Sequence, residues 1–176
     1  CVFEGQCQAF VSQKVETIPV KLPKKTVPQM TSGLLLVFRQ KKILLVRRES
    51  KGIWGGLWTL PETPWEELLQ PVTKNSKPTN KDLDVGEAKL ESYLAHLIEI
   101  SPPQKLPREW MHAFGKAKLL APIKHVFTHR ILYFRPKVMH VEQDIALPEN
   151  MAWFTQKDLT NIGLPTPIKK LLEGFF

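Results

Sequence analysis

Two small groups of side chains in this sequence have types and spacings that can do chemistry. Cys1 and Cys7 are the only two cysteines, too few for a disulfide scaffold but able to offer thiolates as ligands. Phe127, Thr128 and His129 place an aromatic ring, a hydroxyl and an imidazole side by side between two apolar runs. A hydroxyl can donate or accept a hydrogen bond as needed, so this second group suits the reading of a polar ligand edge.

Positive charge gathers at the two ends of the chain, and the net charge is +8. Residues 1–50 hold nine lysines and arginines against three acids, and residues 101–176 hold eleven against six. The middle, residues 51–100, is acidic, with five against eight. This distribution favours a polyanion partner, with nucleic acid first, while a basic domain without such a partner is the alternative.

Composition excludes several classes of protein. An apolar content of 43% excludes global disorder. No apolar run approaches the roughly 20 residues of a membrane span, and the N-terminus has no signal-peptide pattern, so we expect no membrane partner. The length of 176 residues allows one domain with an extension, and we expect a monomer. Because the first residue is Cys1 and not methionine, we expect a fragment or a processed chain.

Apolar runs outline a layered α+β domain that starts near Gln29. Two runs joined by four polar residues predict a hairpin over 34–38 and 43–46, covered on both faces. Further strands are expected over 123–127, 131–134 and 138–141, and a short apolar element at 153–154. Helical periodicity predicts a helix over 88–100, a helical turn is expected over 156–159, and residues 74–84 are expected to form a loop. A terminal helix is expected after Pro165, with Pro167 in its first turn and an apolar stripe formed by Ile168, Leu171, Leu172 and Phe175. Residues 101–118 fit neither pattern.

The glycine–tryptophan segment carries a partial signature. Gly56, five further residues and Glu62 resemble the start of the Nudix hydrolase signature. In that family a following helix carries Arg-Glu and Glu-Glu pairs, whose carboxylates bind the metal that polarises a pyrophosphate. Here the matching positions, 70–71 and 74–75, hold Gln-Pro and Lys-Asn. The resemblance implies a Nudix-like (MutT-like) α/β/α sandwich with a mixed sheet, without the acids of hydrolase chemistry.

No other acids replace the missing ones. Glu66 and Glu67 come too early in the sequence, and Glu87 and Glu91 are typical of a solvated helix face. A nucleotide pyrophosphohydrolase is therefore the alternative function and not the leading one. A partner-binding module without a direct role on DNA is a third hypothesis.

Five stretches together resemble the C-terminal part of MutY-type adenine DNA glycosylases. They are residues 1–10, 22–25, 51–58, 125–129 and 163–172, in the same order and at similar spacing. The resemblance implies the end of an iron–sulfur cluster loop over 1–10 and an extended interdomain linker over 11–28. It implies a Nudix-like DNA lesion-recognition domain over 29–176.

The resemblance also implies a division of labour in base excision repair. The family removes adenine mispaired with 8-oxoguanine. A helical domain that precedes the cluster flips the adenine out of the duplex and cleaves its glycosidic bond. That domain is absent here, so no catalytic residue is expected in this chain and the chain alone is expected to be inactive. Its expected partner is double-stranded DNA with 8-oxoguanine opposite adenine. The expected location is the bacterial cytoplasm with the nucleoid, or the nucleus or mitochondrion of a eukaryote.

Phe127, Thr128 and His129 match the family's Phe-Ser-His loop, which contacts 8-oxoguanine. Threonine replaces serine here, so the hydroxyl is kept while the added methyl restricts its rotamers. Phe127 is a candidate wedge against the base stack. The alternative is a plain hairpin turn with Phe127 in the core and His129 on the surface, and His125 is expected to buttress the turn.

By the same resemblance, Cys1 and Cys7 are ligands of a [4Fe–4S] cluster in the parent protein. Such a cluster needs four thiolates, and this chain has two, so no cofactor is expected in the chain alone. Free thiols are the expected state here, with a local disulfide as the alternative.

We interpret the other residues of the glycine–tryptophan segment as structural. Gly55 and Gly56 are expected to set a turn, and Trp54, Trp58 and Leu60 to pack in the core.

Basic side chains at four neighbouring positions, Lys41, Lys42, Arg47 and Arg48, are candidates for phosphate contacts, but their face is not fixed by the sequence. The lysines over 14–25 suit either a phosphate backbone or a solvated linker.

Overall fold

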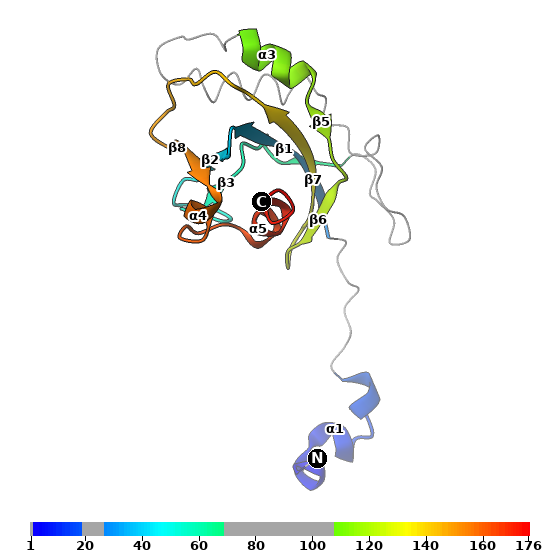
Figure 1. Cartoon of the computed structure of the whole chain (residues 1–176). Coiled ribbons are helices and arrows are strands. Elements are labelled where there is room, and N and C mark those ends of the chain that lie inside the picture. The colour runs from blue at the N-terminus through cyan, green and yellow to red at the C-terminus, as the bar shows by residue number, and fades with distance from the viewer. Residues whose placement is uncertain (1, 19–26, 69–107) are drawn as a thin grey trace.

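The computed structural model describes residues 2–18, 27–68 and 108–176 (Figure 1). The predicted helix over 88–100, the predicted loop over 74–84 and the Nudix positions 70–75 lie outside these ranges, as does Cys1.

The described strands form one mixed sheet of eight strands. They are β1 (Gln29–Arg39), β2 (Lys42–Arg47), β3 (Trp58–Thr59), β4 (Glu66–Glu67), β5 (Lys118–Leu119), β6 (Ile123–Val126), β7 (Ile131–His140) and β8 (Met151–Thr155). The main path runs β3-β2-β1-β7-β5, while β4 pairs with β1, β6 with β7 and β8 with β2. The β1 and β7 strands are parallel and all other pairs are antiparallel, which confirms the predicted mixed sheet.

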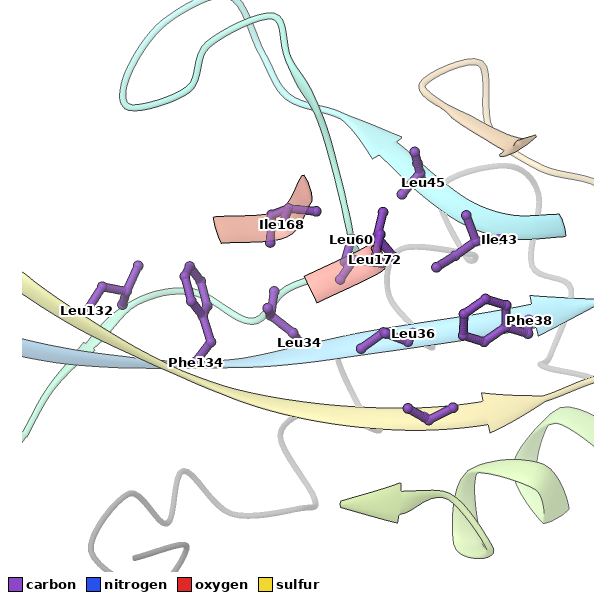
Figure 2. Close-up of a cluster of buried hydrophobic side chains, with 11 residues drawn as sticks. Leu34, Leu36, Phe38, Ile43, Leu45, Leu60, Leu132, Phe134, Ile168 and Leu172 are labelled. Carbon is purple, nitrogen blue, oxygen red and sulfur yellow. The ribbon is translucent and has the colours of Figure 1, made fainter. Parts of the chain in front are cut away.

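The predicted hairpin over 34–38 and 43–46 is confirmed as β1 and β2. Residues 31–38 of β1 are all buried. Since successive side chains of a strand point to opposite sides of the sheet, both faces of β1 are covered. Leu34, Leu36 and Phe38 lie on one face, where Ile168 and Leu172 of helix α5 (Thr166–Leu172) cover them (Figure 2).

The other face of the sheet is covered by helix α3 (Arg108–Gly115). Leu35 and Val37 of β1 join the same cluster as Trp110 and Phe114, which are one helical turn apart on α3. Helices therefore lie on both faces, and the α/β/α sandwich is confirmed. Of the segment 101–118, which fits no sequence pattern, the structure describes residues 108–118, and these contain α3 and the start of β5 (Lys118–Leu119).

The two strands predicted over 131–134 and 138–141 are one strand, β7, so the predicted break is wrong. Pro136 lies inside this strand although proline cannot donate to a strand ladder. Its carbonyl accepts from the Leu120 N–H at 2.9 Å, between the stretches of β7 that pair with β6 and with β5. The N–H and C=O of one strand residue point to the same edge of the strand. The position where Pro136 lacks an N–H therefore faces the unpaired stretch between β6 and β5, and no ladder hydrogen bond is lost there. Lys137 is buried, with its ammonium 4.4 Å from the centroid of the Phe114 ring.

The C-terminal elements agree with the sequence. Helix α4 (Gln156–Leu159) begins with a capping box, in which the Asp158 carboxylate accepts from the Thr155 N–H at 2.7 Å. The hydrogen bonds from the Thr155 backbone and side chain, with the nearby Lys42 charge, lower the pKa of Asp158. Helix α5 has Pro167 in its first turn as predicted. Phe175, expected in its apolar stripe, lies past the helix end and is 39% exposed.

The N-terminal segment is more ordered than the connector that the sequence suggested. It forms the short turns η1 (Glu4–Gln6), α1 (Gln8–Val11) and η2 (Val15–Thr17), with no buried residue in them. Within the described ranges, no helix is long and apolar enough to cross a membrane.

Candidate nucleic-acid interface

The turn between β6 and β7 holds all three residues that the sequence singled out. Its closing bond runs from the Phe127 N–H to the Arg130 carbonyl at 2.8 Å. Thr128 and His129 are exposed at the tip, while Phe127 is half-buried beneath them. The turn therefore presents one hydroxyl and one imidazole to solvent.

An aromatic cluster supports the turn. The ring centroid of Phe127 lies 4.5 Å from that of His125, 5.3 Å from that of Trp54 and 5.8 Å from that of Trp65. His125 lies 5.6 Å from Trp54 in turn, and burial lowers the pKa of the imidazole. Phe127 is thus half-buried, and its ring packs against the three other rings of this cluster.

The glycine–tryptophan loop brings Trp54 to this cluster. Gly56 has φ +75° and its N–H donates to the Glu49 carbonyl at 2.9 Å, so the chain folds back tightly. A Cβ atom on Gly55 would lie 2.4 Å from the Ser50 carbonyl oxygen, which restricts that position to glycine. Trp54 itself has φ +61°. Of the residues expected in the core, Leu60 is fully buried, whereas Trp54 and Trp58 are half-buried against it.

A cleft of about 760 Å³ adjoins the turn. It is lined by the loop after β2, by residues 59–65 and by Arg130. Glu62, the glutamate of the partial Nudix signature, is 7% exposed and forms an ion pair with Arg48. The described residues contain no group of three or more histidine, cysteine, aspartate or glutamate side chains able to hold a metal ion. Glu62 is thus neutralised by arginine here.

The structure separates the basic candidates into two places. Arg47 and Arg48 line the cleft, whereas Lys41 and Lys42 lie at the turn between β1 and β2. The start of β7 is in register with Gln29, at the other end of β1. Ten residue steps of about 3.3 Å therefore separate the lysines from the β6–β7 turn along the sheet.

Sequence reasoning missed two residues of this region. The Arg130 guanidinium lies 5.7 Å from the centroid of the Trp65 ring, and both residues line the cleft. Arg130 directly follows residues 127–129, and a cation next to them could have been predicted to belong to the site. Nothing in the local sequence around Trp65 indicates that it belongs there.

Of the two cysteines, the structure describes Cys7. Cys7 is a free, half-exposed thiol that precedes α1, and Cys1 lies outside the described residues. With two cysteines in the sequence, the chain cannot supply the four thiolates of a [4Fe–4S] cluster by itself.

The NUDIX domain family matches residues 33–174, most of the chain. The chain belongs to the NUDIX domain family. This Nudix domain is also similar to a curated adenine DNA glycosylase of Buchnera aphidicola subsp. Acyrthosiphon pisum (strain APS), with 22% identity over 178 residues. That match covers 99% of this chain and 41% of the relative, so the chain spans about two fifths of its length. The predicted resemblance to MutY-type C-terminal parts is confirmed.

Solved structures agree on the fold of the Nudix domain. The C-terminal domain of mouse MUTYH, in a complex with human PCNA, matches with a TM-score of 0.53 and 18% identity, covering 83% of this chain and 86% of that chain. A MutT protein from Methanosarcina mazei Go1 matches with a TM-score of 0.54 and 15% identity, covering 86% and 96%. These likenesses confirm the predicted Nudix-like fold.

Proposed function

We propose that this Nudix domain is the lesion-recognition part of an adenine DNA glycosylase of base excision repair, which removes adenine mispaired with 8-oxoguanine. One observation carries the proposal. In a chain similar over 99% of its length to an adenine DNA glycosylase, Thr128 and His129 are exposed on a turn that an aromatic cluster holds in place.

The proposed reading of the lesion follows from its chemistry. 8-Oxoguanine carries an oxygen at C8 and a proton at N7, where guanine has a hydrogen and an acceptor. The Thr128 hydroxyl can accept from N7–H or donate to the C8 oxygen, and the His129 imidazole adds a second polar contact. The Phe127 ring, packed on Trp54 and Trp65, fixes the backbone from which both side chains project. One good base contact gives about 1–3 kcal/mol of discrimination.

Adenine removal is proposed for the rest of the parent protein. The chain spans about two fifths of the curated relative, and we assign no catalytic residue to it. The chain alone is expected to release no adenine from DNA. Cys1 and Cys7 are proposed as two of the four ligands of a [4Fe–4S] cluster that the parent protein completes. With a bacterial relative, the proposed location is the cytoplasm, at the nucleoid.

A nucleotide pyrophosphohydrolase is the second candidate, because the NUDIX family match favours it. Two observations count against it: the signature positions 70–71 and 74–75 hold Gln-Pro and Lys-Asn in place of acids, and Glu62 is paired with Arg48. Incubation of the chain with nucleoside triphosphates and Mg²⁺ or Mn²⁺ separates the two functions. Clear turnover of these substrates would reverse the order of the candidates.

The variant Thr128→Ala tests the lesion-recognition proposal. The measurement is the ratio of dissociation constants for two duplexes, with guanine or 8-oxoguanine opposite adenine. We expect the preference for 8-oxoguanine to fall about fivefold or more, in line with the loss of about 1 kcal/mol or more of base contact. Thr160→Ala, which removes an exposed hydroxyl after α4, is the matched control and should leave the ratio unchanged. An unchanged ratio in Thr128→Ala would contradict the assignment.

A further inference from the structure

The cleft beside the β6–β7 turn carries more positive than negative charge. Its charged lining consists of Arg47, Arg48, Lys51 and Arg130 against Glu49 and Glu62. We call this cleft, with these lining residues, the basic cleft. Its formal excess of two positive charges makes it complementary to an anion.

Three of the four positive charges of the basic cleft are not cancelled by ion pairs among the described residues. Arg48 is paired with Glu62, so these two charges offset one another. In the part of the chain that the structure describes, no carboxylate is paired with Arg47, Lys51 or Arg130. Arg47 and Lys51 are exposed, and Arg130 is half-buried against the Trp65 ring. Three cations are therefore available to a ligand.

Some side chains that line the basic cleft also carry buried polar atoms. The Thr59 hydroxyl and the Trp65 indole N–H are buried without a hydrogen-bond partner among the described residues, and so is one carboxylate oxygen of Glu62. Buried polar atoms are usually satisfied by protein or by water. The positive lining, and not these buried atoms, makes the basic cleft complementary to a hydrated phosphate group.

We propose that the basic cleft holds the phosphate backbone of the DNA strand whose damaged base the β6–β7 turn reads. The proposal rests on the proposed function, since it takes DNA as the ligand. Arg130 directly follows His129 and lines the cleft, so the cleft continues from the reading turn without a gap. Arg47 and Lys51 then extend the path of cations away from the turn. Glu49 is the opposing charge, and it is exposed to solvent.

Counterion release gives the size of the expected effect. Each phosphate contact to duplex DNA contributes about 0.9 to the slope of log affinity against log salt. The variants Arg47→Gln, Lys51→Gln and Arg130→Gln should each lower this slope by about 1, and each should weaken binding about eightfold at 0.1 M salt. Phosphate contacts carry no sequence information, so the loss should be equal for damaged and undamaged duplexes.

The test compares two triple variants of the chain at 50 to 200 mM salt, on duplexes with 8-oxoguanine or guanine opposite adenine. The cleft variant is Arg47→Gln/Lys51→Gln/Arg130→Gln. The control variant is Lys157→Gln/Lys169→Gln/Lys170→Gln, which removes the same charge from exposed positions on α4 and α5 that do not line the cleft. Arg130→Lys checks that folding is intact, because it keeps the charge and should keep the slope.

The outcomes separate the two proposals. A slope lowered by about 3 in the cleft variant alone, with the 8-oxoguanine preference kept, supports the basic cleft as the phosphate site. Equal slope losses in both triple variants would overturn it, because the effect would then follow net charge. If the chain prefers 8-oxoguanine and the cleft variant binds normally, the cleft proposal fails and the proposed function stands. If the slope falls in the cleft variant but the unmodified chain does not prefer 8-oxoguanine, the cleft is supported as a phosphate site and the proposed function fails. No DNA binding by the unmodified chain would overturn both.

Discussion

Replacement of Phe127 by alanine tests how the β6–β7 turn is held. The ring is half-buried and contacts three other rings, those of His125, Trp54 and Trp65. Truncation of a fully buried phenylalanine costs about 3–5 kcal/mol, so half of that burial corresponds to about 2 kcal/mol. Aromatic pairs of about 0.5–1.5 kcal/mol each account for a share of this cost. A melting temperature lower by about 4–8 °C follows for a chain of this length.

Urea unfolding, followed by tryptophan fluorescence, measures the effect of Phe127→Ala on the free energy of unfolding. Thr128→Ala and His129→Ala are the matched controls, since both side chains are exposed on the same turn. Each control should change the free energy of unfolding by less than about 0.5 kcal/mol. A loss below about 0.5 kcal/mol in Phe127→Ala would refute the anchoring role and would favour a ring that is free to act as a wedge.

Three further predictions concern the elements that support the site. Arg48→Ala should lower the free energy of unfolding by about 3 kcal/mol, because it leaves the buried Glu62 carboxylate unpaired; a double variant that also carries Glu62→Gln should recover part of the loss, and equal losses would contradict this. Burial lowers the pKa of His125 below its ordinary 6.5, so stability should fall as the pH drops from 6.5 towards the folded-state pKa; His125→Gln should flatten this dependence, and an unchanged pH profile would contradict it. Gly55→Ala, whose Cβ would meet backbone at 2.4 Å, should cost about 2 kcal/mol or more. Gly163→Ala, whose Cβ would meet only a leucine methyl at 2.8 Å, should cost clearly less in the same urea titration.

Local sequence patterns predicted the helices and strands correctly where apolar residues recur at regular spacing. The hairpin of β1 and β2 is an apolar run on each side of a polar turn, and α5 has a helical stripe led by Ile168 and Leu172. The same approach failed at β7, because the sequence cannot say that Pro136 faces a gap in strand pairing. Helix α3 was missed although Trp110 and Phe114 have helical spacing, since polar residues and prolines surround them.

Of the candidate site, only residues 127–129 could be predicted from the sequence. Thr128 and His129 are neighbours in the chain, so no long-range contact was needed to bring them together. The ion pair of Arg48 with Glu62 joins residues 14 positions apart, and Trp65 reaches Phe127 across 62 positions. Such contacts depend on how β2, β4 and β6 are arranged in the sheet, which no local pattern encodes.

The most direct test of lesion recognition is the ratio of dissociation constants of the unmodified chain for two otherwise identical duplexes. One carries 8-oxoguanine opposite adenine and the other carries guanine opposite adenine, both at 0.1 M salt. We predict that the chain binds the 8-oxoguanine duplex at least about fivefold more tightly, the size of one base contact of about 1 kcal/mol. Equal affinity for the two duplexes would contradict the assignment of this Nudix domain as a lesion-recognition domain.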